Sequence, residues 1–339
     1  MSRTLARLLQ APSVILLLFW MLVPLSFTIF FSLIRYQLVS LRRPEWTQPD
    51  IGNWRGLGNY EYVLNNPKFF EFNFGAFSFF NPASENFLNF GVLSFFGESA
   101  VGNTIFMVGS ILILTVVLGL AIAVLLNRVF PGRGIARVMV ISPFFIMPAV
   151  NAVLWINMLL DPVLGLNGIA VGGINDFIDG LEGLPLLGAF FASWPDLEAI
   201  SFRAPQTSAI AVIIMVVWQW TPFAVLIFMT SLQSEDQEQK EAAVLDGANA
   251  FSQFWNLTLP HLARPIAIVV MIQAIFHLSL YAEIEITTRG SGNLNLPYLI
   301  GTFANNNIGA ASAAGIFAVI FANIIAIFIM RMVGKNLMD

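Results

Sequence analysis

Six long stretches that are almost free of charge constrain the fold more than any other feature of this sequence. Crossing about 30 Å of hydrocarbon takes about 20 apolar residues as a helix, and each charge near the middle costs about 3 kcal/mol. The stretches lie at about 13–36, 99–127, 138–160, 206–232, 265–284 and 308–331. We therefore predict an all-α membrane protein with six transmembrane helices, which places both chain termini on the same side.

The composition agrees with a bilayer as the main solvent. Hydrophobic residues make up 57% of the 339 residues and charged residues 11%, far outside the ordinary range of soluble proteins. The net charge is -4 without any run of Lys or Arg, which excludes a nucleic-acid partner. With no cysteine and only His261 and His277, we expect neither a disulfide framework nor a metal site.

The first apolar stretch has two readings. Arg3 and Arg7 precede it, as in a secretory signal. However, the run is about twice the length of a signal core, and no small-residue cleavage site stands before Arg35. We therefore expect a retained helix.

Basic residues set the expected orientation. Lys and Arg accumulate in short cytoplasmic loops, and three arginines fill the tight connection at 128–137, with Arg331 and Lys335 at the C-terminus. These segments, and with them both termini, are predicted to be cytoplasmic. Arg35, Arg42 and Arg43 oppose this assignment, but they open a loop of about 60 residues, where the rule weakens.

Two outer loops are expected, at 37–98 and 161–205. The first is large and contains a Phe-rich segment at 69–96, which either rests at the lipid headgroups or, as we favour, packs into a small external subdomain. The second is acidic. Its apolar run at 184–194 is too short to cross a membrane and is predicted to be interfacial or buried.

The cytoplasmic connection at 235–262 is the most informative segment. Ala242, Ala243 and Leu245 favour a helix, and Gly247 is a natural helix end because glycine takes the left-handed conformation. A second apolar helix follows before Pro260. Small residues around the break leave the backbone open to another surface. An amphipathic loop lying on the inner membrane surface is the plainer alternative.

The sequence of this connection resembles a known motif. Glu241-Ala242-Ala243, then Asp246-Gly247-Ala248, Phe254 and Leu259-Pro260 resemble the EAA loop of binding-protein-dependent ABC transporter permeases. The segment 56–60 and the tail from Thr287 are similar to sugar permeases, closest to the sorbitol/mannitol type. Two departures are the string Arg289-Gly290-Ser291-Gly292 in place of the usual Gly-Gly-Pro, and the segment 69–96, which looks inserted.

The resemblance implies a permease subunit that is not an enzyme and carries no cofactor, with ATP and Mg bound by a separate ATPase. It implies a bacterial inner-membrane location and alternating access to a polyol or related small carbohydrate, or alternatively to another sugar or glycoside. Implied partners are a second homologous permease, an ATPase dimer, a periplasmic solute-binding protein and membrane lipids. The coupling contacts to the ATPase would come from Glu241, Ala242, Ala243, Leu245, Asp246, Gly247 and Ala248.

Polar and aromatic side chains inside the spans are candidates for the solute path, because lipid tolerates amides poorly. The candidates are Asn151, Trp155, Trp218, Gln219, Gln273, His277 and Tyr281. The last three are spaced by four residues, which predicts one helix face. The alternative for each is a structural hydrogen bond between helices or interfacial anchoring, and we expect the former for Asn323.

Two other function classes find little support. A secondary transporter would need buried ion-coupling carboxylates, yet the apolar cores of the six stretches contain no Asp or Glu, and Glu283 stands where the fifth stretch ends. An intramembrane enzyme would need a recognisable motif, and no phosphate-binding loop or His-Glu-x-x-His string occurs.

Overall fold

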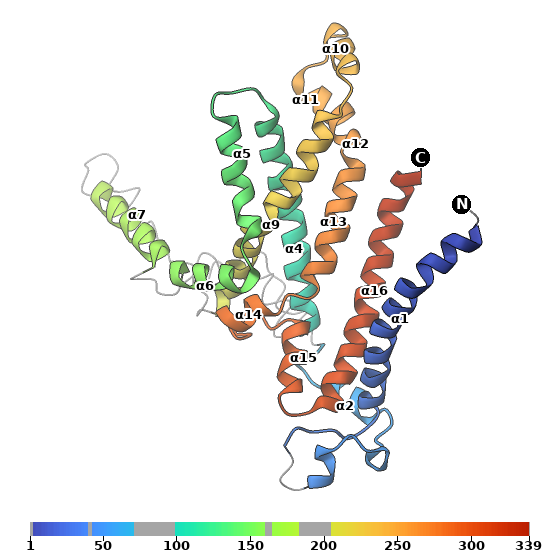
Figure 1. Ribbon diagram of the computed structural model, residues 1–339. Helices are drawn as coiled ribbons and strands as arrows, with labels where there is room; N and C mark the ends of the chain where they lie inside the picture. The colour runs from blue at the N-terminus through green and yellow to red at the C-terminus, as the bar shows by residue number, and fades with distance from the viewer. Residues whose placement is uncertain (1–2, 40–42, 71–98, 160–164, 183–204, 339) are drawn as a thin grey trace. The chain divides into compact units, whose positions relative to one another are not determined.

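The computed structural model describes residues 3–39, 43–70, 99–159, 165–182 and 205–338, which form helices joined by turns (Figure 1). Extended pairing in this part of the chain is limited to two isolated bridges, Ile34–Trp54 and Gln37–Asn307. Four described helices are long and apolar enough to cross a membrane, and up to six spans result if each of two bent helix pairs counts as one. The architecture is all-helical, as predicted.

The chain divides into two compact units. The first consists of Met1–Phe70 and Leu296–Asn323, and the second of Glu71–Asn295 and Ile324–Asp339. The helices of the first unit are α1 (Arg3–Ser32), η1 (Pro44–Thr47), η2 (Ile51–Asn53), α2 (Gly58–Leu64), α15 (Leu296–Ala304) and the first half of α16 (Ile308–Met338).

Asn59 organises the first unit at the end of α1. Its side chain is fully buried, and Nδ2 donates to the carbonyl oxygens of Ser32 (2.9 Å) and Ile34 (2.7 Å). The Ser32 carbonyl is in the last turn of α1, where helical partners run out, and Ile34 lies two residues beyond the helix end. Gly309, at the start of α16, packs so closely here that an added Cβ would lie 2.6 Å from the Ile34 oxygen. The segment 56–60 therefore ties α1, α2 and α16 together.

The second unit is built on α4 (Ala100–Asn127) and α9 (Pro205–Gln233), which cross closely and occupy the second and fourth apolar stretches. A Cβ added at Gly119 would lie 2.6 Å from Cβ of Ala224, so small residues let the two backbones approach. Phe228 and Leu262 fill the core beside them. α5 (Arg133–Ile141) and α13 (Ala263–His277) pack on this pair (Figure 1).

The stretch at 138–160, expected as one span, is not a single helix. α5 and the 3-10 turn η4 (Ser142–Phe145) are followed by α6 (Pro148–Leu159), which is bent away by 104°. Pro148 disfavours helical backbone at the residue before it, Met147, and Ile146 is already extended with ψ 131°. The two prolines at 143 and 148 were the sequence signal for this break.

The stretch at 265–284 is also divided. α13 ends at His277, and after a turn the short helix α14 (Ala282–Thr287) packs against α6. Tyr281 directly precedes α14, so the expectation that it continues the face of Gln273 and His277 is wrong. The side chain of Asn295 donates to the Leu280 oxygen in the intervening turn, which holds the chain in this non-helical path.

The outer segments are described only in part. α7 (Leu166–Glu182) is a helix within the predicted outer loop 161–205. The Phe-rich segment beyond Phe70 and the run 184–194 lie outside the described residues. Asn323, expected to join two helices, instead donates to the Val319 oxygen of its own helix (2.8 Å), so that expectation is wrong.

Candidate functional site

The loop between α9 and α13 forms a helix, a break and a second helix, as the sequence predicts. α10 (Gln237–Leu245) begins after Asp236, whose carboxylate accepts from the Glu238 amide (2.9 Å). α11 (Ala250–Gln253) begins after Asn249, whose side chain accepts from the Ser252 amide (2.8 Å). A π-helical turn, η5 (Phe254–Thr258), and α12 (Leu259–His261) lead back to α13.

The break has a defined geometry set by Gly247. Its φ is +82°, the left-handed region that glycine enters without strain. The Gly247 amide donates to the Val244 oxygen (3.0 Å), and the Ala248 amide donates to the Ala243 oxygen (2.9 Å). These two bonds are the Schellman pattern that closes a helix C-terminus. The prediction that Gly247 ends the helix is confirmed.

The surface at this break is exposed and mixed in character. Glu241, Ala242 and Asp246 are exposed, and Leu245 is 87% exposed despite being apolar. Ala243 and Ala248 are half-buried against the turn itself. Such a surface, with small residues beside a charge and a projecting leucine, suits contact with another protein more than contact with water.

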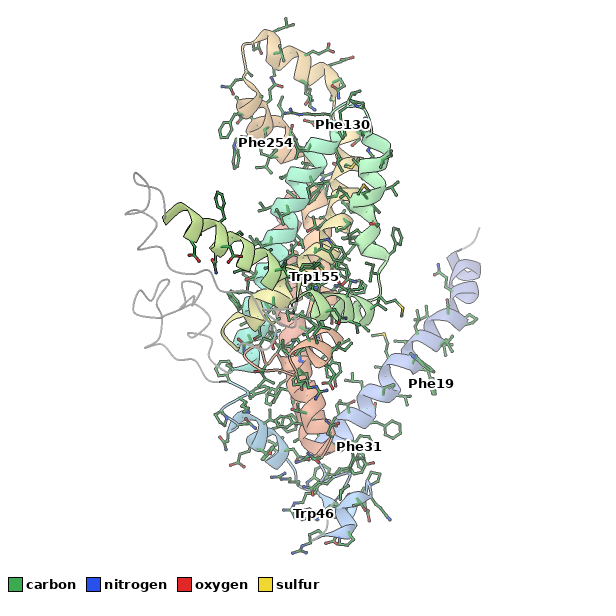
Figure 2. All side chains as sticks on the ribbon, turned by 90° about the vertical axis from the view of Figure 1, so that its left-hand side faces the viewer. Phe19, Phe31, Trp46, Phe130, Trp155 and Phe254 are labelled. Atoms are coloured by element: carbon green, nitrogen blue, oxygen red, sulfur yellow. The ribbon has the colours of Figure 1, made fainter. Side chains whose placement is uncertain are left out.

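The loop lies at one end of the second unit. Figure 2 shows Phe254 on the returning arm of the loop and Phe130 in the connection after α4 near the same end, with Trp155 well away from it. The α4–α5 connection is tight, since Arg133 Nε donates to the Leu126 oxygen (2.8 Å). Both connections thus lie at the end of the unit that the sequence assigns to the cytoplasm.

The amides expected on the solute path are buried and hydrogen-bonded to other groups of the protein. Asn151 Nδ2 donates to Gln219 Oε1 (2.9 Å), and Gln219 Nε2 donates to the Ile146 oxygen at the α5–α6 bend (2.6 Å). Thr115 Oγ1 donates to Gln273 Oε1 (2.6 Å), which joins α4 to α13. These three amides therefore hold helices together in the described state.

Aromatic rings gather where α9 meets α13. Trp220 packs edge-on against His277, with ring centroids 4.9 Å apart, and against Phe276 at 5.1 Å. Gln273 Nε2 donates to the Trp220 oxygen (3.3 Å), so the two buried candidates Gln273 and His277 both contact Trp220. Phe276 is 56% exposed. Phe276 was not among the residues predicted for the solute path. Its position one residue before His277 was the signal that could have indicated it.

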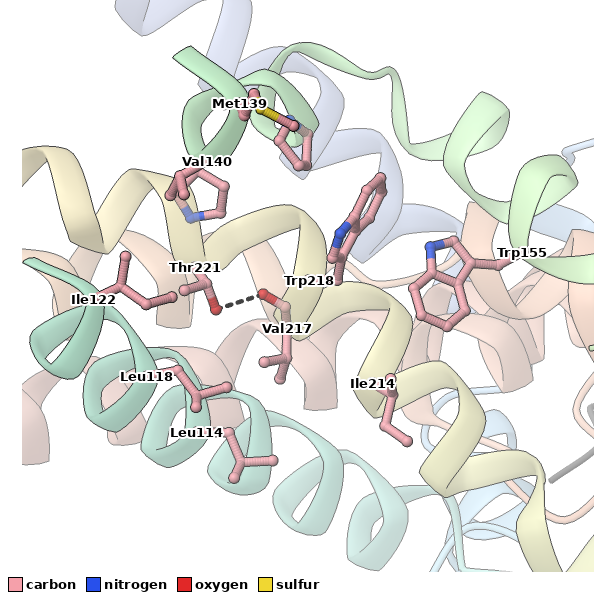
Figure 3. Close-up of a pocket in the computed structure, with 12 residues that line it drawn as sticks. Leu114, Leu118, Ile122, Met139, Val140, Trp155, Ile214, Val217, Trp218 and Thr221 are labelled. Atoms are coloured by element: carbon pink, nitrogen blue, oxygen red, sulfur yellow. Dashed lines mark hydrogen bonds between the residues drawn. The ribbon is translucent and has the colours of Figure 1, made fainter. Parts of the chain in front are cut away.

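Trp155 and Trp218 meet in a second place, a cavity of about 630 Å³ between α4, α5, α6 and α9 (Figure 3). Their ring centroids are 5.8 Å apart. The other lining residues are mostly aliphatic, and the hydroxyl of Thr221 donates to the Val217 oxygen (2.6 Å). This cavity therefore offers apolar contacts and two indole faces.

Tyr281 is separated from the other candidates by the end of α13, and it is 40% exposed beside α14. The structure thus brings the predicted path residues together in two groups. One contains Gln273 and His277 around Trp220, and the other contains Asn151, Gln219, Trp155 and Trp218 around the α5–α6 bend.

Comparison with known proteins places this arrangement in a family. Residues 116–339 match the family model described as binding-protein-dependent transport system inner membrane component. The inner membrane ABC transporter permease protein YcjO of Escherichia coli (strain K12) is 31% identical over 212 residues, 62% of this chain and 66% of that protein. The match thus spans just under two thirds of the relative's length.

Two further comparisons extend over most of the chain. The sn-glycerol-3-phosphate transport system permease protein UgpA of Agrobacterium fabrum is 24% identical over 347 residues, covering 99% of this chain and 96% of the relative. A crystal structure of a bacterial ABC transporter involved in the import of alginate contains a chain with the same fold, with TM-score 0.60, 20% identity and coverage of 97% and 99%. The chain belongs to the family of binding-protein-dependent transport system inner membrane components.

Proposed function

We propose that the chain is the membrane-spanning permease subunit of an ATP-driven importer, and that a separate ATPase moves it by gripping the loop around Gly247. The observation that carries this proposal is the exposed, hydrogen-bonded turn at Gly247, which presents Glu241, Ala242 and Leu245 at one end of the helix bundle. The family assignment supports the same role.

The proposed mechanism has two states. Closure of the ATPase dimer around nucleotide displaces the turn at Gly247, and α9 and α13 carry the displacement because both are continuous with the loop. Tilting of these helices opens the solute path outward, and hydrolysis resets it. In this scheme Glu241 supplies the charged contact and Ala242 and Ala243 the close-fitting surface, while ATP and Mg stay on the partner.

A carbohydrate is the proposed solute class, with a polyol as the narrower proposal and another sugar or glycoside as the alternative. The multiple sugar-binding transport system permease protein MsmF of Streptococcus mutans, which is 27% identical over 241 residues, supports the class by its name. The exposed ring of Phe276 beside Trp220 supports it physically, since apolar C–H faces of sugars pack on aromatic rings.

The proposed partners are a second homologous permease, two ATPase copies and an external solute-binding protein in a bacterial inner membrane. A crystal structure of the alginate transporter holds an alginate pentasaccharide-bound periplasmic protein, and one of its chains shares this fold with TM-score 0.59. That likeness supports a binding-protein partner here.

Reconstitution of the purified complex in liposomes tests the proposal. The chain is co-expressed with its candidate partners, and uptake of radiolabelled polyols and sugars is followed with and without ATP and the binding protein. We expect uptake only when both are present, and no ATP hydrolysis by this chain alone. Solute uptake by the isolated chain, or purification without any ATPase, would contradict the proposal.

A further inference from the structure

A buried carboxylate stands at the base of the coupling loop, outside the segment that faces the ATPase in the proposed function. Glu235 lies between the end of α9 and the start of α10, and its side chain is only 5% exposed. It is the residue before Asp236, the N-cap of α10. It therefore stands at the junction between α9 and α10.

Glu235 contacts both arms of the loop. Thr258 Oγ1, at the last residue of the π-helical turn η5, donates to Glu235 Oε1 (2.8 Å). Lys240 Nζ, one turn into α10, lies 2.9 Å from Oε2 as an ion pair. One carboxylate thus joins the outgoing helix to the returning arm.

A second contact joins the same two arms one turn closer to the bundle. His261 Nε2 lies 3.0 Å from the Ser231 oxygen at the end of α9. A small cavity of about 160 Å³ beside the carboxylate is lined by residues of both arms, mostly polar ones. The arms are therefore connected through polar contacts at this level, and the contact at Glu235 is the one that reaches α10.

The buried carboxylate of Glu235 depends on both of its partners, Thr258 and Lys240. A carboxylate removed from water is costly unless it is paired and hydrogen-bonded, and Glu235 has one partner of each kind. Lys240 remains partly exposed, at 26%, so the ion pair lies at the edge of the buried site. Loss of either partner leaves the carboxylate buried with incomplete compensation.

We propose that Glu235 is a positioning residue for energy coupling: it joins α10 to the returning arm, so that a displacement of the turn at Gly247 moves α9 and α13 together. This inference rests on the proposed function, because it assumes that an ATPase displaces the turn at Gly247. It assigns no contact with ATP or solute to Glu235. Without the contact, α10 can pivot about residues 234–236 while α13 stays in place.

The experiment uses the complete importer in liposomes and measures the number of solute molecules imported per ATP hydrolysed. For Glu235→Ala we expect the ATPase to co-purify normally with the permease and to hydrolyse ATP at a near-normal rate. The number of solute molecules imported per ATP should fall severalfold. Glu235→Gln, which keeps an acceptor for Thr258 but loses the ion pair, should give an intermediate ratio. Glu238→Gln removes an exposed carboxylate from the same helix and should leave the ratio unchanged.

A charge exchange separates positioning from folding. The double variant Glu235→Lys with Lys240→Glu restores an ion pair and should recover most of the lost ratio, whereas each single change should not. An unchanged ratio in Glu235→Ala, or a lower yield of complex with an unchanged ratio per complex, would overturn the proposal. Failure of the proposed function itself would look different, since the wild-type complex would then show no ATP-dependent uptake.

Discussion

Asn59 shows how one residue can serve several helices in the first unit. Its amide bonds two carbonyl oxygens at the end of α1, and its own oxygen accepts from Arg55 Nη1 (2.8 Å). Gly309 lies so close that an added Cβ would also come within 2.7 Å of Asn59 Nδ2. Residue size and hydrogen bonding are therefore both constrained at this junction.

Asn59→Ala should lower the free energy of unfolding by about 1–3 kcal/mol, because it leaves buried carbonyls without a donor. Thermal unfolding of the purified complex in detergent measures this effect. Asn65→Ala, at an exposed asparagine just after α2, is the matched control and should change stability little. Equal melting temperatures for both variants would contradict the assigned role of Asn59.

Gln273 and His277 act through Trp220 in our account. Replacing either by alanine should lower solute uptake severalfold while ATPase attachment stays intact, because Trp220 loses a contact that holds its ring or backbone. Uptake assays and co-purification on the same preparations measure both properties. Asn323→Ala removes an exposed polar side chain that donates to the Val319 oxygen of its own helix, and it serves as the control. Unchanged uptake in both test variants would remove these residues from the solute path.

At the scale of elements, the α4–α9 contact depends on small residues. The added Cβ at Gly119 would meet Ala224, whereas a Cβ at Gly109 of the same helix meets nothing within 4 Å. In a membrane, close backbone approach supplies much of the attraction between helices, since lipid tails are as apolar as the side chains. This pair therefore depends on tight packing rather than on hydrophobic burial.

Gly119→Val should separate α4 from α9 and destabilise the protein by about 1–3 kcal/mol through overpacking. Gly109→Val makes the same substitution at an open position and should destabilise the protein much less. Thermal unfolding of the two variants side by side measures the difference. If both variants melted alike, the proposed close contact would be wrong.

The elements also show where sequence reasoning succeeded and failed. The apolar stretches at 99–127 and 206–232 are occupied by α4 and α9, because length and low charge alone determine such helices. The bend between α5 and α6 was missed, although Pro143 and Pro148 signalled it. The end of α13 at His277 has no such local signal, since it depends on contacts such as that of the distant Asn295.

Only part of the candidate site could be predicted from the sequence. The break at Gly247 could be predicted because a left-handed glycine is a local property of the chain. The pairing of Asn151 with Gln219 and of Gln273 with Thr115 could not, since each joins helices far apart in sequence. The sequence identified polar residues in apolar surroundings but not whether they contact each other or a solute.

In the whole molecule, the energy for transport comes from another protein in the proposed function, a separate ATPase. The loop at Gly247 has the exposure of a docking surface, and it joins α9, one of the two central helices of the second unit, to α13, which packs on both of them. The protein contains no cysteine, so pairs of engineered cysteines can report distances in the otherwise native importer. The central claim is that a separate ATPase moves this chain by binding the turn at Gly247.

Attachment of the ATPase to a permease altered at the turn tests that claim most directly. The test variant combines Glu241→Arg with Gly247→Val, and the control is Gly132→Val, a glycine of similar left-handed φ (+84°) and equally open surroundings in the α4–α5 connection. We predict that the test variant loses both ATPase co-purification and ATP-driven uptake, whereas the control keeps its ATPase. Retention of ATPase and uptake by the test variant would contradict the account.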